Sequence, residues 1–238
     1  CSDMPPFDKI RAEHFMPAFE RGMSLHDAEI DAITSNNDEP TFENTILAYD
    51  NAGQMLAQTE LIFGMLCAAE TNERMQALQE QVMPLLSAHR DKIRLDEKLF
   101  ARVKDVYDRR ASLGLDAEQS RLLRKTYDAF VRSGALLDAG QKARLKEING
   151  ELSLTAVKFG NNILAENNNF ALELTADDLE GLPSGVRDAA REKAQAMGKG
   201  DKWVFTLHKP SLIPFLTYSA KRDLREKIYK AYLNRCNN

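Results

Sequence analysis

The residues best suited to metal or acid–base chemistry are the four histidines of this chain, His14, His26, His89 and His208. The HExxH motif places two zinc ligands on one face of a helix, but no two of these histidines stand four residues apart. None of them follows a glutamate by three residues either, which is the spacing of carboxylate-bridged di-iron bundles. The sequence therefore predicts no catalytic and no metal-ligating residue, and no cofactor in this chain.

The other reactive side chains also lack a recognisable setting. The three cysteines, Cys1, Cys67 and Cys236, are spaced for neither a zinc site nor a CxxC redox pair. Cys67 lies in an apolar helical stretch, where a thiol is a poor nucleophile because burial disfavours the thiolate. His89 falls on an apolar stripe and is expected to be a hydrogen-bonded core residue. The glycine-rich stretch 198–202 is too short for a phosphate-binding loop and is expected to form a turn.

Composition and charge narrow the class of protein. The chain has 238 residues, 43% hydrophobic and 29% charged, with a net charge of −4, which is typical of a globular protein rather than a disordered one. This charge balance does not indicate a nucleic-acid partner. No apolar run reaches the length of about 18 residues that a transmembrane helix requires.

Most of the chain has helical periodicity with local capping signals. Thr41 is expected to cap a helix with an apolar stripe from Phe42 through Gly53 to Leu56. The next helix should carry Leu85 on its apolar stripe and be kinked or split by Pro84. Its full predicted stripe is Met75, Leu78, Val82, Leu85, His89 and Ile93.

Further caps and two strands complete the predicted fold. Asp96, the pair Asp116 and Gln119, and the pair Asp138 and Gln141 should each open a helix, the last one reaching to about residue 165. Strands are expected near 170–174 and 203–207, paired across a helical insert. The predicted fold is therefore mainly α, with stacked antiparallel helices, a small two-stranded β element and a sub-boundary near 167–169.

Five stretches, in this order and spacing, carry a family resemblance. They are "PFDKIRAEHFMPAFERGM", "PTFENTILAYD", "LLSAHRDKI", "LTADDLEGLP" and "WVFTLHKPSLIPFLTYSAKRDLREKIYKAYLNR". Together they resemble the amino-terminal part of the M3 family of zinc metallopeptidases, and within it the peptidyl-dipeptidases more than the oligopeptidases. The resemblance runs from about Pro6 to Arg235 and covers nearly the whole chain.

The resemblance implies that this chain shapes the substrate channel of the enzyme and does not itself hydrolyse peptide bonds. Members of this family are mostly helical, with two lobes flanking a deep channel and zinc at its floor, held by HExxH and a further glutamate in a catalytic half. No counterpart of those residues exists here, so the resemblance makes residues 1–238 a non-catalytic amino-terminal fragment that forms one wall of the channel. It implies zinc in the parent enzyme, short peptides as ligands and the catalytic half of the same polypeptide as partner.

The two ends of the chain carry further expectations. An initial Cys1 would suit a lipid-anchored protein of the bacterial cell envelope, whereas an arbitrary starting point leaves a cytoplasmic location equally open. On the closing helix, Leu224, Ile228 and Tyr232 share one stripe and are the candidates for docking on the catalytic half, or for a dimer of the fragment. The alternative is a stand-alone helical peptide-binding or scaffold protein.

Overall fold

The structure is a computed structural model that describes residues 4–237. The chain divides into two compact units, residues 1–157 and 158–238, and the boundary lies inside one long helix. Cys1, the predicted lipid attachment point, lies outside the described residues. In the described part no helix has the length and apolar character needed to cross a bilayer. The predicted fold is confirmed, since helices dominate and two short strands pair antiparallel.

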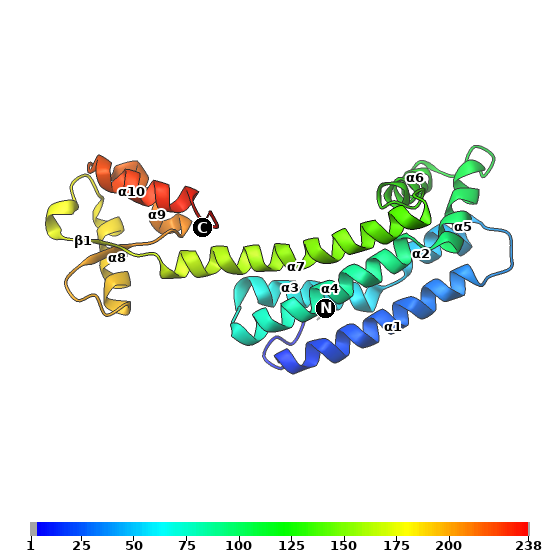
Figure 1. The fold of residues 1–238 in the computed structure, drawn as a ribbon, viewed down its shortest axis with the longest axis horizontal. Helices are drawn as coiled ribbons and strands as arrows, with labels where there is room; N and C mark the ends of the chain where they lie inside the picture. The colour runs from blue at the N-terminus through cyan, green and yellow to red at the C-terminus, as the bar shows by residue number, and fades with distance from the viewer. Residues whose placement is uncertain (1–3, 238) are drawn as a thin grey trace. The chain divides into compact units, whose positions relative to one another are not determined.

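The first unit is built from helices that follow one another through short turns (Figure 1). Their bounds are η1 Ala12–His14, α1 Phe15–Thr34, η2 Phe42–Leu47, α2 Ala48–Asn51, α3 Gln54–Ala69, α4 Glu73–Arg94, α5 Glu97–Asp108 and α6 Ala117–Arg132. The long helix α7, Ala139–Asn169, begins in this unit and contains the boundary to the second one. The predicted caps are confirmed, because the side chains of Thr41, Asp96, Asp116 and Asp138 each accept a hydrogen bond from the backbone N–H three residues on.

Two apolar clusters hold this unit together. Phe15 and Phe19 of α1 pack edge to face on Phe63 of α3, with ring centroids 5.0 and 5.3 Å apart, a geometry that aromatic rings favour. The second cluster joins the far end of α1 to η2, α5 and α6 around the fully buried Ile46 and Leu99. Because Phe15 and Phe19 lie beside Phe63 while Gly22 lies beside Leu56, α1 and α3 run antiparallel.

The predicted continuous helix from Thr41 to Leu56 is wrong. The segment begins as a π-helical turn, η2, and the helix stops after α2, where Ala52 is extended and Gly53 has φ of +75°. A Cβ on Gly53 would stand 2.8 Å from Cε1 of His26, so only glycine allows the backbone this close to α1. The apolar spacing continued across this break and concealed it.

Two expectations for α4 also need correction. Of the predicted kink or split at Pro84, the split does not occur, because the helix extends from Glu73 to Arg94. Leu85 is exposed, and Leu86 takes its place in the core beside Val82 and His89. Both positions satisfy helical spacing from Val82, so the sequence alone could not distinguish them. Packing on both sides of Pro84 outweighs the hydrogen bond that proline removes.

The second unit surrounds its small sheet with short helices. Its elements are β1 Leu172–Leu174, η3 Ala176–Asp178, α8 Ser184–Ala196, β2 Trp203–Phe205, α9 Lys209–Tyr218 and α10 Arg222–Leu233. Leu172 pairs with Phe205 and Leu174 with Trp203, which confirms the pairing predicted across the helical insert. Stretch 198–202 forms the expected turn, with positive φ at Gly198 and Gly200.

The left-handed conformation of Gly53 gives the first testable prediction. Gly53→Ala should lower the free energy of unfolding of unit one by about 1–3 kcal/mol, because it adds strain at positive φ and a clash with His26. Gly64→Ala, in the middle of α3 with open space around the new Cβ, should be neutral or stabilising by up to about 1 kcal/mol. Urea unfolding followed by far-ultraviolet circular dichroism measures both, and equal effects of the two variants would refute this account of the break.

Candidate functional site

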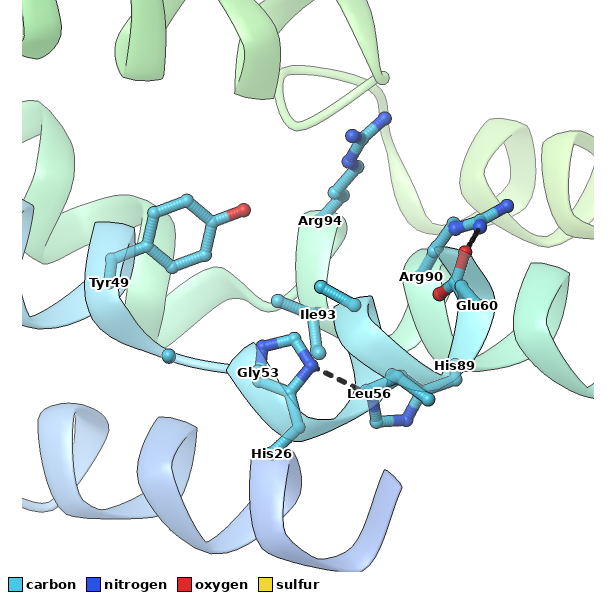
Figure 2. A pocket seen from close by; sticks show the side chains of 11 residues that line it. His26, Tyr49, Gly53, Leu56, Glu60, His89, Arg90, Ile93 and Arg94 are labelled. Carbon is cyan, nitrogen blue, oxygen red and sulfur yellow. Dashed lines mark hydrogen bonds and ion pairs between the residues drawn. The ribbon is translucent and has the colours of Figure 1, made fainter. Parts of the chain in front are cut away.

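Two histidines of the first unit, which sequence reasoning did not connect, lie in contact with each other. Nε2 of His89 lies 3.1 Å from Nδ1 of His26. Figure 2 shows the two rings, one from α4 and one from α1, joined by a dashed line between these nitrogens. His89 is 7% exposed, so its prediction as a hydrogen-bonded core residue is confirmed. Its partner stands 63 residues away in the chain, and no local pattern could have identified it.

The break before α3 positions this pair. The N–H of Gly53 donates a hydrogen bond of 2.7 Å to Oε2 of Glu29, one turn beyond His26 on α1. This bond ties the start of α3 to α1 and brings the His26 ring against the Gly53 backbone. The missing side chain at Gly53 is therefore what makes room for the imidazole.

Charged groups surround the pair on both sides. Nδ1 of His89 stands 3.7 Å from Oδ1 of Asp27, and that carboxylate also pairs with Lys92 at 2.9 Å. Glu60 of α3 pairs with Arg90 of α4, as the dashed line in Figure 2 marks. The two histidines, Glu60 and Arg90 border a cavity of about 190 Å³. Tyr49 and Arg94 also line it.

Burial sets the protonation of both imidazoles. It lowers the pKa of His26 and of His89 below the usual value for histidine, because the charged form loses its solvation. Nearby Asp27 and Glu60 oppose this lowering, but burial is the larger effect on both pKa values. A neutral pair can form one N–H···N bond, whereas two imidazolium ions would both be donors and would repel each other. The arrangement favours the neutral pair and makes it sensitive to acid.

The described residues were also compared with the requirements of a metal site. Among residues 4–237, no group of three or more histidine, cysteine, aspartate or glutamate side chains is arranged to hold a metal ion. Burial raises the pKa of Cys67, which agrees with the expectation that this thiol is unreactive.

The predicted docking residues on α10 belong largely to the core of the second unit. Ile228 is fully buried among the apolar residues around the sheet, at 0% exposure. Leu224 and Tyr232 are half-buried against the same cluster. Only the outer parts of these two side chains are accessible, and docking through them stays a prediction.

Helix α3 presents a more prominent apolar surface, which the sequence analysis did not single out. Leu61 is 64% exposed and Met65 is 48% exposed. The helix contains no lysine or arginine, and its one carboxylate, Glu60, is paired with Arg90. We call its exposed side the uncharged face of α3, made of Gln54, Ala57, Gln58, Leu61, Gly64, Met65 and Ala68.

The histidine pair gives a prediction for pH. Both pKa values are lower in the folded protein than in the unfolded chain. As the pH falls toward and below about 6.5, the unfolded state therefore binds more protons than the folded state does. The free energy of unfolding should therefore decrease between pH 7.5 and 5.5. His89→Gln should reduce this decrease, while His208→Gln, an exposed position in the second unit, should leave it unchanged. Chemical denaturation across this pH range measures the slopes, and an unaltered slope in His89→Gln would contradict the assignment.

Comparison with known proteins finds relatives that are named as peptidases. No family model matches it. It is 37% identical over 228 residues to Dipeptidyl carboxypeptidase of Escherichia coli K12, a match that covers 95% of this chain and 34% of that protein. The corresponding enzyme of Salmonella typhimurium LT2 is 36% identical, with the same coverage of both chains. Oligopeptidase A of Escherichia coli K12 is 26% identical over 98% of this chain and 34% of its own length.

The extent of these matches defines what part of the relatives is present. The chain spans about a third of the length of the curated proteins that it matches. The identity to these relatives over 95% or more of this chain confirms the resemblance predicted from the sequence. Along nearly its whole length, the chain is therefore a homologue of the dipeptidyl carboxypeptidases and oligopeptidases A of the M3 family, and it corresponds to the amino-terminal part of such proteins.

Proposed function

We propose that this chain is the non-catalytic amino-terminal region of a zinc-dependent peptidyl-dipeptidase, and that it forms one wall of a channel for short peptides. The names of the relatives support peptide hydrolysis, and the matched third of their length leaves ample chain for a catalytic part. A wall of rigid helices would select ligands by size, because an extended peptide fits a narrow channel and a folded domain does not.

The uncharged face of α3 is the observation that carries this proposal. Exposed helix surfaces of globular proteins normally bear charged side chains, whereas the centres of protein interfaces are depleted of them. Leu61 and Met65 are large apolar side chains on this face, and no charged residue interrupts it. A surface of this kind is expected to be covered, and the remaining part of the same enzyme is the partner that we propose.

We propose different roles for this chain and for the remaining part of the enzyme. In residues 4–237 no cluster of side chains fits a zinc ion, so we assign zinc to the part of the enzyme that lies outside this chain. We derive no step of hydrolysis from the residues described here. Their proposed contribution is to contact the peptide, to exclude folded substrates and to dock on the catalytic part, with Leu224 and Tyr232 as a second contact.

A matched pair of surface leucines tests the docking role of α3. Leu61 and Leu136 are 64% and 62% exposed, so replacing either by aspartate in residues 1–238 should change the free energy of unfolding by no more than about 0.5 kcal/mol. In the complete gene product, Leu61→Asp should lower kcat/KM for a short peptide at least about ten-fold, since a buried unpaired charge costs several kcal/mol. Leu136→Asp should not. Equal activity of both variants would contradict docking through α3.

Turnover by the chain alone tests the absence of catalytic groups. Purified residues 1–238, supplied with zinc, should release no dipeptide from short peptide substrates, because the described residues offer no zinc ligand cluster. The complete gene product, assayed under the same conditions, serves as the positive control. Hydrolysis by residues 1–238 that a chelator abolishes would overturn the proposal.

A further inference from the structure

A groove between α4 and the first part of α7 has the features of a binding site that the proposed function does not use. Its volume is about 410 Å³, within the range of small-ligand sites. Each helix lines the groove with one of its faces, and the lining residues follow the same sequence spacing in both helices. Those of α4 are Met83, Ser87, Arg90, Asp91 and Arg94, and those of α7 are Leu145, Asn149, Leu152, Ser153 and Ala156.

Side-chain contacts fix the relative direction of the two walls. Nδ2 of Asn149 donates a hydrogen bond of 2.8 Å to Oδ1 of Asp91, which joins the walls near the middle. A guanidinium N–H of Arg94 lies 3.4 Å from Oγ of Ser133, just after α6. Since Leu145 packs beside Gly134, it lies at the Arg94 end of the groove. The helices are therefore antiparallel, with Met83 and Ala156 toward the opposite end.

One end of the groove is strongly basic. Arg90, Arg94 and Arg132 line it, against a single carboxylate, Asp91. That carboxylate accepts the hydrogen bond from Asn149, and Arg90 is paired with Glu60 outside the groove. Arg94 and Arg132 have no carboxylate partner among the ion pairs of the described residues. Arg94 also interacts with the phenol of Tyr49, where it opposes the rise in that group's pKa that burial causes, and its contact with Ser133 is long for a hydrogen bond.

The other end of the groove is apolar. Met83, Leu152 and Ala156 line it, and Leu152 is exposed. Hydroxyl groups of Ser87 and Ser153 lie between the two ends on opposite walls. A ligand that fits this distribution carries an anionic group at one end and an apolar body at the other.

We propose that this groove binds a carboxylate attached to an apolar group, with the carboxylate held by Arg94 and Arg132 and the apolar part against Met83 and Leu152. Guanidinium groups suit this ligand because they bind carboxylates through paired, charge-assisted hydrogen bonds. Asp91 disfavours an anion in the middle of the groove and directs it to the arginine end. The carboxyl terminus of a peptide and a free apolar acid share this chemistry, and the proposal does not depend on the role of α3.

Binding measurements on residues 1–238 test the groove. The probes are N-acetyl-Ala-Leu, its carboxamide, isovalerate as a free apolar acid, and inorganic phosphate, each titrated by calorimetry at low salt. The test variant is Arg94→Gln with Arg132→Gln. Its control is Arg121→Gln with Arg124→Gln, which removes the same charge from exposed positions of α6 outside the groove. Thermal unfolding by circular dichroism checks that both double variants stay folded.

We expect a different affinity for each probe. N-acetyl-Ala-Leu, isovalerate or both should bind, at least about ten-fold more weakly to the test variant and with unchanged affinity to the control variant. Binding of the acidic peptide alone would identify the peptide carboxyl terminus as the ligand group, and binding of isovalerate alone would identify a free apolar acid. The carboxamide should bind at least about ten-fold more weakly than the acid, and phosphate should bind more weakly because it leaves the apolar end unfilled.

Four results would overturn the proposal. They are equal binding of acid and amide, phosphate binding as tight as that of the apolar acids, the same loss in the control variant as in the test variant, and no binding of either apolar acid. If the test variant proves unfolded, Leu152→Asp replaces it, because a carboxylate at the apolar end should also weaken binding about ten-fold. Unchanged binding in folded Leu152→Asp would count against the groove.

Discussion

A helix can bury only part of its surface against one neighbour, and α3 has apolar residues on more sides than α1 covers. Leu56 and Phe63 face the core, while Leu61 and Met65 face away from it. Burial of one side stabilises the first unit, and exposure of the other leaves an uncharged surface that water solvates poorly. The proposal that α3 docks on the remaining part of a larger enzyme depends on that imbalance.

Local signals in the sequence were sufficient where the structure depends on neighbours along the chain. The caps at Asp96 and Asp116 are hydrogen bonds between residues three apart, so spacing alone predicts them. The strands around 172 and 203 also follow from alternation and turn residues.

Two positions show the limit of periodicity. Gly53 continued the apolar stripe although the helix stops there, and Leu85 satisfied the same spacing as Leu86.

The candidate sites were harder to predict because they depend on contacts between distant helices. Nothing near His89 in the sequence points to His26. The space that the His26 ring occupies also depends on Gly53, because a Cβ there would stand 2.8 Å from the imidazole. Helix α4 connects these features, since Arg90 and Arg94 border both the histidine cavity and the groove beside α7. The family resemblance predicted a peptidase relationship, but it did not indicate which surfaces of this chain are unusual.

Oxidation of Met65 by dilute hydrogen peroxide is the most direct measurement of the central claim, because it reads the exposure of the methionine that lies on the uncharged face of α3. Peptide mass spectrometry would compare residues 1–238 with the complete gene product, using Met4, 82% exposed, and Met75, 5% exposed, as references. The account predicts that Met65 oxidises readily in residues 1–238 and is protected in the complete protein, relative to both references. Equally rapid oxidation of Met65 in the two proteins would contradict it.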